Sequence, residues 1–384
     1  MKKKLMMIPG PTPVDQSILD ALSKDTVSHL DPEFVKILKE TLEDLKTVVM
    51  TKKGQPFIIP GTGTLGMEVA IVNSLKKGDR LLVVSHGFFG DRFVEIAQCY
   101  GIEVEVLASE WGKIVEVEEI AQKLKEKKFD AITLSHVDTS TGVCAPLKEV
   151  GEILKQFSET VFIVDGVCAT GGIEERMDDW GIDILFTGNQ KAFGVPPGLT
   201  NAVFNEKALE RRNSLGKISA FYMDVNRWLP VMRDPAGGYF STHAINMVYA
   251  LHQGLKIMLA EGLEERFKKY KRFASAFQSG LKELGFNLLA VEEIRANTVS
   301  TILYPAGIED LSFREKLYEN GVLVSAGKGV LAGKIFRLGH MGNISENEVV
   351  ATLSIIEKTL SDINYDFRLG AGIGAAEKVL FAKE

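Results

Sequence analysis

Hydrophobic and polar positions follow two different periods along the first two-thirds of the chain. Short runs of β-branched and other apolar residues predict strands, and longer stretches with apolar residues at helical spacing separate them. The predicted strands are 56–59, 80–84, 103–106, 131–134, 160–164 and 182–186, and the predicted helices are 66–75, 93–100, 117–127 and 147–157. This alternation predicts an α/β fold whose mostly parallel sheet is covered by helices on both faces.

The pattern changes after about Leu251. A helical pattern runs from His243 to about Glu283, with a break at Glu261–Gly262. Predicted strands at 298–304, 322–324 and 334–338 and helices at 311–320 and 345–360 follow. Their order predicts a smaller α+β C-terminal domain. We expect a large domain at 15–255 and a small domain made of 1–14 and 256–384, with a Gly- and Ala-rich tail that is ordered only by docking.

Composition narrows the class of protein. A chain of 384 residues with 45% hydrophobic content is long enough for two domains, and its net charge of −6 argues against a general nucleic-acid binder. Cys99, Cys144 and Cys168 form no C-x-x-C, which argues against a disulfide framework or a zinc site. The apolar start at 5–8 is too short for a signal peptide, and no apolar run approaches the roughly 18 residues of a membrane span. We therefore expect a cytoplasmic protein without a membrane partner.

Two charged residues stand directly after predicted strands, where ligands bind in such sheets. Asp165 follows the strand at 160–164 and suits either a turn or a carboxylate that pairs with a cationic heterocycle. Lys191 follows the strand at 182–186 through T-G-N-Q, and a stiff G-V-P-P-G turn comes after it. Most lysines lie on the surface, but a desolvated lysine at a sheet edge can act as a nucleophile and then as a base.

The segment Gly61–Thr64 follows the first strand and precedes a helix, so its N–H groups and hydroxyls suit a phosphate. Literally, residues 61–66 also match the G-x-G-x-x-G pattern of NAD-binding proteins. That pattern expects an acidic residue after the next strand, and none stands there before Asp91. A glycine turn that only starts a helix remains an alternative.

Three further features are candidates for ligand contacts. Phe89 stands between glycines at a strand end and can stack on a flat ring, although a core position is the alternative. The hydroxyl-rich run 135–142 is either a plain turn or a contact to a cofactor hydroxyl. Arg337 interrupts an apolar strand and needs an anionic partner, either a substrate carboxylate or an internal salt bridge.

Short motifs stand in a characteristic order along nearly the whole chain. They are P-G-P-T at 9–12, P-G-T-G-T at 60–64, H-G-F-F-G at 86–90, T-S-T-G at 139–142, V-D-G-V at 164–167, D-I-L-F-T-G-N-Q-K-A-F-G-V-P-P-G at 183–198, F-Y-M-D at 221–224, Y-F-S-T at 239–242 and F-R-L-G-H-M-G at 336–342. This ordered set resembles the class V aminotransferases of fold type I, which depend on pyridoxal 5′-phosphate (PLP). Within them it resembles the alanine–glyoxylate, serine–pyruvate and serine–glyoxylate group.

The resemblance implies a role for each candidate around the cofactor ring. Lys191 would hold PLP covalently and then move the proton between the substrate α-carbon and the cofactor. Asp165 would pair with the pyridine nitrogen, and Thr139 would contact the ring hydroxyl. Phe89 and Val167 would cover the two ring faces. Many relatives carry Trp in place of Phe89, so we expect somewhat weaker stacking and a larger pocket here.

The resemblance also implies phosphate and substrate contacts. Tyr239 and Thr242 would reach the phosphate from a neighbouring subunit, which implies a homodimer with shared active sites. The remaining implied contacts are Thr62, Gly63, Thr64 and Gln190 for the phosphate, and Arg337 with Gly10 for the substrate carboxylate.

The sequence therefore predicts a PLP-dependent aminotransferase that acts on a small amino acid, serine or alanine, and a 2-oxo acid, glyoxylate or pyruvate. Aspartate is an alternative donor, because Arg233 or Arg295 could bind a second carboxylate. A cysteine desulfurase or selenocysteine lyase would need a cysteine before Arg337, and residues 325–333 contain none. A non-catalytic accessory subunit, as in relatives labelled soluble-hydrogenase small subunit, would have little reason to keep Lys191, Asp165 and Arg337 together.

Overall fold

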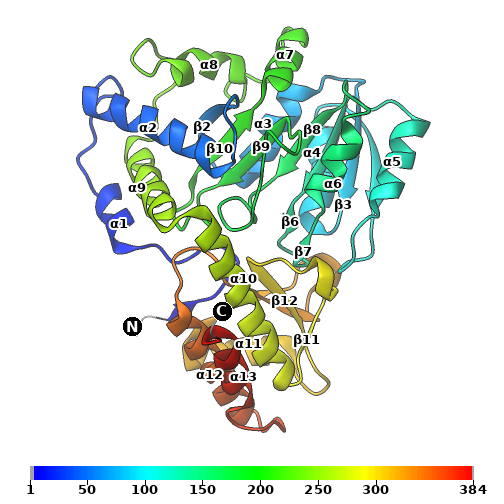
Figure 1. Ribbon diagram of the computed structural model, residues 1–384, viewed down its shortest axis with the longest axis vertical. Helices are drawn as coiled ribbons and strands as arrows, with labels where there is room; N and C mark the ends of the chain where they lie inside the picture. The colour runs from blue at the N-terminus through cyan, green and yellow to red at the C-terminus, as the bar shows by residue number, and fades with distance from the viewer. Residues whose placement is uncertain (1–3, 383–384) are drawn as a thin grey trace.

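A seven-stranded sheet forms the centre of the larger part of the molecule in the computed structural model, which describes residues 4–382 (Figure 1). Its order is β2 (Gln55–Gly61), β10 (Gly198–Phe204), β9 (Ile184–Gly188), β8 (Val161–Asp165), β5 (Ala131–Ser135), β3 (Arg80–Ser85) and β4 (Glu103–Ala108). Strand β10 is antiparallel to both of its neighbours, and all other pairs are parallel. The predicted mostly parallel sheet is confirmed.

Helices cover both faces of this sheet. On β3, Leu81 and Val83 join one hydrophobic core with α2, α3 and α9, whereas Leu82 and Val84 join a second core with α5 and α6. Alternate side chains of one strand are therefore buried on opposite faces, as in a sheet covered on both sides. The helices are α1 (Gln16–Leu22), α2 (Pro32–Val48), α3 (Gly63–Ser74), α4 (Phe88–Cys99), α5 (Val117–Glu126), α6 (Leu147–Leu154), α7 (Glu206–Ser214), α8 (Val225–Arg233) and α9 (Ile245–Glu261).

The smaller part of the molecule lies below the sheet in Figure 1 and contains a four-stranded antiparallel sheet. Its order is β11 (Asn287–Leu288), β12 (Val299–Leu303), β15 (Ile335–Gly339) and β14 (Ser325–Ala326), and the helices around it are α10 (Leu263–Glu283), α11 (Asp310–Asn320), α12 (Glu346–Asp362) and α13 (Ala371–Leu380). Strand β1 (Leu5–Met6) of the N-terminal segment pairs in parallel with β13 (Val322–Leu323). The core here also includes Val137 and Ala192 of the larger part, and the boundary near residue 255 stays a prediction.

The chain breaks between α9 and α10 at Gly262, whose φ of +86° lies in the left-handed region that favours glycine. This is the break predicted at Glu261–Gly262. The Gly- and Ala-rich tail forms α13, which packs on α10 and α12. Buried Glu357 of α12 accepts hydrogen bonds from the N–H groups of Gly370, Gly372 and Ile373 at the start of α13. The carboxylate therefore satisfies the free N–H groups of that helix terminus.

Two predicted helices begin too late. Helix α3 starts at Gly63 rather than residue 66, and α4 starts at Phe88 rather than residue 93. The first turns of both helices contain glycines that approach other side chains closely, so they lack the apolar spacing that predicts a helix. The antiparallel strand β10, which starts at the end of the expected G-V-P-P-G turn, was not predicted.

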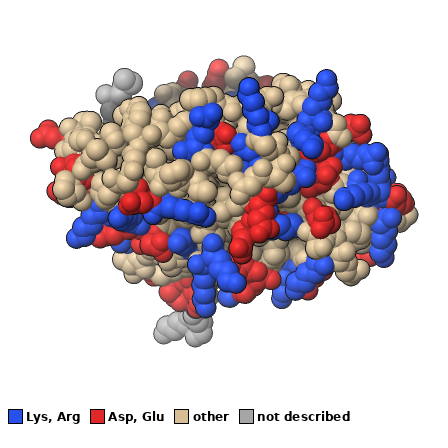
Figure 2. Space-filling view, turned by 90° about the horizontal axis from the view of Figure 1, so that it is seen from above, with Lys and Arg blue, Asp and Glu red and all other residues tan. Residues whose placement is uncertain are grey.

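The surface agrees with the composition. On the face shown in Figure 2, Lys and Arg are interspersed with Asp and Glu, with no broad patch of one sign. Between residues 4 and 382, no helix has both the length and the apolar content needed to cross a bilayer.

Candidate active site

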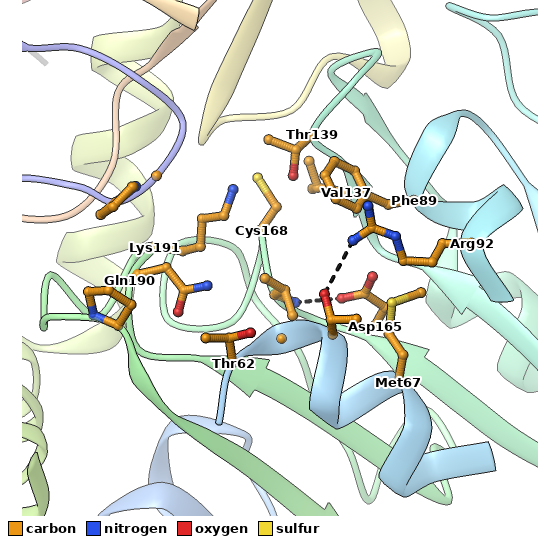
Figure 3. A pocket seen from close by; sticks show the side chains of 16 residues that line it. Thr62, Met67, Phe89, Arg92, Val137, Thr139, Asp165, Cys168, Gln190 and Lys191 are labelled. Carbon is orange, nitrogen blue, oxygen red and sulfur yellow. Dashed lines mark hydrogen bonds between the residues drawn. The ribbon is translucent and has the colours of Figure 1, made fainter. Parts of the chain in front are cut away.

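A pocket of about 290 Å³ opens where the carboxyl ends of β8 and β9 meet the start of α3 (Figure 3). Lys191, Gln190 and Thr62 lie on one side of it, and Asp165, Phe89 and Arg92 lie on the other. The predicted residues that line it are Gly10, Thr62, Gly63, Thr64, Phe89, Thr139, Asp165, Val167, Gln190 and Lys191. The fold thus brings together candidates that are up to 181 residues apart in sequence, from Gly10 to Lys191.

Lys191 follows β9 and is only 9% exposed. Its Nζ donates a short hydrogen bond to the Pro9 carbonyl. A Cβ at Gly10 would lie 2.7 Å from Cδ of Lys191, and Gly10 has a φ of +132°, so only glycine suits this contact. Burial lowers the pKa of Lys191, and the positive charge of Arg337 lowers it further. A neutral amine, which is the nucleophilic and basic form, is therefore more accessible here than on a surface lysine.

Asp165 ends β8 and accepts hydrogen bonds from the Val167 N–H at 2.9 Å and the Ser135 hydroxyl at 3.2 Å. Burial raises the pKa of its carboxyl to about 6, and the negative charge of Asp138 adds to this effect. Such a carboxylate gains most from a cationic partner inside the pocket. It therefore suits the protonated nitrogen of a heterocycle.

The residues predicted to bind a phosphate lie at the start of α3. Thr62 is the residue that precedes the helix, and Gly63 and Thr64 form its first turn. A Cβ at Gly63 would lie 2.7 Å from Cγ2 of Val167, so the backbone here approaches Val167 more closely than a residue with a side chain would allow. Across from it, the buried Oε1 of Gln190 has no hydrogen-bond partner among the described residues. The helix N-terminus suits a bound phosphate. The Oε1 atom of Gln190 only accepts hydrogen bonds, so the Gln190 side chain would bind a phosphate oxygen through its Nε2 group.

Phe89 lies in the first turn of α4, which a residue from another element holds in place. One oxygen of buried Asp138 accepts hydrogen bonds from the N–H groups of both Phe89 and Gly90, each at 3.0 Å. The Phe88 ring meets Phe89 edge-on at 5.4 Å, and the Arg92 guanidinium lies 5.1 Å from each ring. Sequence reasoning did not single out Asp138 or Arg92. Arg92 could have been found from its i, i+4 spacing to Phe88, which places the two side chains on one face of a helix.

Arg337 lies in the middle of β15 and is 5% exposed. Its Nε donates to the Ala326 carbonyl at 2.9 Å, and its Nη1 donates to the carbonyl of the pocket residue Thr139 at 3.2 Å. Arg337 forms no salt bridge with any residue in the range 4–382, so the alternative of an internal ion pair is not observed. The guanidinium is held beside the pocket and remains available to an anion.

Tyr239 and Thr242 lie outside the pocket of their own chain. Tyr239 is 63% exposed, and its hydroxyl lies 3.3 Å from that of Thr242. This position is compatible with the predicted contact to a neighbouring subunit, which stays a prediction. Cys168 and Met67 line the pocket as well, although neither was a candidate.

The comparisons with known proteins agree with this geometry. The model of the family described as aminotransferase class-V matches residues 9–347. The chain belongs to the class-V aminotransferases. An uncharacterized aminotransferase of Methanocaldococcus jannaschii is 38% identical, with 98% of each chain covered. The soluble hydrogenase small subunit of a Synechococcus species is 32% identical, also with 98% of each chain covered.

A crystal structure of the ureidoglycine–glyoxylate aminotransferase of Bacillus subtilis superimposes with a TM-score of 0.94 at 32% identity, covering 99% of this chain and 98% of the other. Further relatives at 30–33% identity are named for glyoxylate together with aspartate, serine or alanine. The fold is thus that of the PLP-dependent aminotransferases, and PLP is the cofactor of this class-V aminotransferase.

The residues present fit PLP. Lys191 would hold its aldehyde carbon, Asp165 its ring nitrogen, and the start of α3 with Gln190 its phosphate. When bound, PLP accepts the electrons that remain when the substrate α-carbon loses its proton. Arg337 would orient the substrate carboxylate, Asp165 would keep a proton on the ring nitrogen, and the Lys191 amine would serve as the base for the proton of the α-carbon. Asp165 and Lys191, the two candidates for handling protons, line the same pocket of this class-V aminotransferase.

Proposed function

We propose that this class-V aminotransferase transfers the amino group of a small amino acid, serine or alanine, to glyoxylate or pyruvate. The observation that carries the proposal is that a buried lysine of lowered pKa, Lys191, lies in the pocket, and an arginine, Arg337, lies beside it without a salt bridge to any of residues 4–382. One anchored guanidinium suits the single carboxylate of a small donor. The names of the glyoxylate-using relatives support the choice of acceptor.

The test is a panel of half-reactions in which single amino acids are added to the holoenzyme. Loss of the PLP absorbance band without an added keto acid identifies a donor, and return of the band on adding glyoxylate or pyruvate identifies the acceptor. If no amino acid in the panel changes the band, the proposal is wrong.

Aspartate is the second candidate donor. Neither arginine that the sequence offered for a second carboxylate lines the pocket: Arg233 ends α8 on the surface, and Arg295 donates to the Ala290 carbonyl in a separate depression. Arg92, however, lines the pocket itself. This observation keeps an acidic donor in consideration.

We further propose a homodimer in which Tyr239 and Thr242 complete the site of the partner subunit. Phe221 is 64% exposed, and its ring lies 5.6 Å from that of Phe240, so aromatic surface surrounds these two residues. Exposed aromatic surface of this kind supports a protein contact. Light scattering coupled to gel filtration measures the mass of the assembly, and a monomer at micromolar concentration would contradict the proposal.

We also propose that the protein works in the cytoplasm, a location supported by three cysteines that are all free. The accessory-subunit alternative predicts protein without the PLP band. The complete set of Lys191, Asp165 and Arg337 supports catalysis instead.

A further inference from the structure

Two cationic side chains that the sequence did not single out lie near Arg337: Arg92 lines the pocket, and Lys328 shares the Phe88 ring with Arg92. Lys328 lies in the segment between β14 and β15, and its Nζ is 5.4 Å from the centre of the Phe88 ring. The Arg92 guanidinium is 5.1 Å from the same ring. Arg337 donates to the carbonyl of Ala326, two residues before Lys328. The loop that carries Lys328 is thus tied directly to the arginine assigned to the substrate carboxylate.

The loop is held against the same aromatic residues. A Cβ at Gly329 would lie 2.9 Å from the Trp111 ring and 3.8 Å from the Phe88 ring. Phe88 in turn contacts Phe89, which lines the pocket. Lys328 therefore lies against Phe88, in the loop whose Ala326 carbonyl Arg337 binds.

The positive charges of this cluster are not balanced by the described residues. Lys328 forms no salt bridge within residues 4–382, and burial together with the charges of Arg337 and Arg92 lowers its pKa. Asp138 is the carboxylate that interacts with Arg337, but its oxygens already accept from Ser140, Phe89 and Gly90. A cluster of this kind is stabilised by bound anions.

The three cationic side chains differ in the hydrogen bonds that they already form. Arg92 donates to the hydroxyl of Thr64 in the predicted phosphate site. Arg337 is fixed by two carbonyl oxygens. Among the three, only the Lys328 ammonium group has no hydrogen bond to the described residues, and its long stem lets it reach ligands of different length. It is the free cation for a second negative group.

We propose that Lys328 binds the side-chain carboxylate of a dicarboxylic amino acid, such as aspartate, whose α-carboxylate is held by Arg337. The assignment rests on the proposed function, because it takes Arg337 as the site of the α-carboxylate. Serine and alanine would leave Lys328 without a counter-charge. The donor range therefore extends from these small amino acids to acidic ones.

The experiment compares a dicarboxylate with a monocarboxylate on the holoenzyme. Succinate and propionate are titrated by calorimetry into the wild type, Lys328→Gln and Lys334→Gln. Lys334 is an exposed lysine of the same loop, so its substitution is a control with the same change of charge. We expect Lys328→Gln to weaken the binding of succinate at least about fivefold and to change the binding of propionate less than about twofold. Lys334→Gln should change the affinity for neither ligand.

The assignment would be overturned if Lys328→Gln weakened the binding of succinate and propionate equally, or weakened the binding of neither. Lys328→Arg keeps the charge and should retain the preference for succinate, which separates a lost contact from a disturbed loop. Neither ligand has an amino group, so the titration does not depend on turnover. If amino acids leave the PLP band unchanged while the succinate effect is seen, the transamination proposal fails and the second carboxylate site stands.

Discussion

Burial shifts the pKa values of the two titratable groups proposed to carry the chemistry, Lys191 and Asp165, in opposite directions. It lowers the pKa of Lys191 and raises that of Asp165, because in each case it disfavours the charged form. Both groups therefore approach the pH range in which an enzyme works. Each shift has a separate consequence that can be measured.

Replacing Lys191 with Ala removes both the attachment point and the base. We expect the variant to bind PLP only non-covalently and to lose about 10²–10⁴-fold or more in turnover. Borohydride reduction followed by mass spectrometry checks the attachment, because wild-type protein retains the added mass of the cofactor and the variant does not. Turnover at the normal rate in Lys191→Ala would refute the role of this lysine.

The ionised form of Asp165 should destabilise the folded apoprotein. Its folded pKa of about 6 lies above the ordinary 3.8, so the folded chain binds a proton more tightly than the unfolded chain. Stability from this group is present at low pH and is lost as pH rises from about 4 to about 6. The difference in pKa corresponds to roughly 3 kcal/mol at most.

Asp165→Asn should therefore stabilise the apoprotein at about pH 8, by up to roughly 3 kcal/mol, and much less at about pH 4.5. Urea unfolding of both proteins at the two pH values measures this. The same variant should bind PLP more weakly, because the neutral amide cannot form an ion pair with a protonated nitrogen. A variant that is less stable at both pH values would contradict the argument.

Among the elements, α4 has a start that depends on a distant residue. The sequence predicted the later turns of α4 from their apolar spacing but not the first turn at Phe88–Gly90. The N–H groups of that turn bind Asp138, which is 49 residues away from Phe89. Local patterns predicted most strands and helices of the large sheet. They could not reveal a helix start whose cap comes from another segment.

Asp138→Ala should destabilise the protein by about 2 kcal/mol, because it leaves two N–H groups at the start of α4 without an acceptor. It should also weaken PLP binding, since Phe89 loses its fixed place beside the ring. Urea unfolding and an absorbance titration with PLP measure the two effects. Asp138→Asn keeps one acceptor oxygen and should recover most of both, whereas unchanged PLP affinity in Asp138→Ala would show that Asp138 does not position Phe89.

At the scale of the whole molecule, the pocket depends on contacts between distant parts of the chain. Gly10 packs on Lys191, and Arg337 of the small sheet contacts Thr139 of the large part. Motif order predicted these residues, because each stands in a recognisable segment. Lys328 and Arg92 stand outside the roles that the motifs imply, and only their shared contact with Phe88 reveals them.

The largest assembly predicted here is a dimer with shared sites, and mixed dimers test it. Lys191→Ala removes a residue that each subunit places in its own site. The double variant Tyr239→Ala/Thr242→Ala removes the residues that each subunit is proposed to place in the site of its partner. If the sites are shared, a heterodimer of the two inactive proteins has one site with both defects and one with neither. Random mixing then leaves about a quarter of all sites intact.

Co-expression of the two inactive proteins should therefore restore about a quarter of the wild-type activity. If each chain instead built its site alone, every site would keep one defect and no activity would return. A mixture of Lys191→Ala with Asp165→Asn is the control, because both residues lie in the pocket of one chain. Each of its sites carries one of the two defects, half of them Lys191→Ala, so its activity should be about half that of Asp165→Asn alone, whatever the assembly.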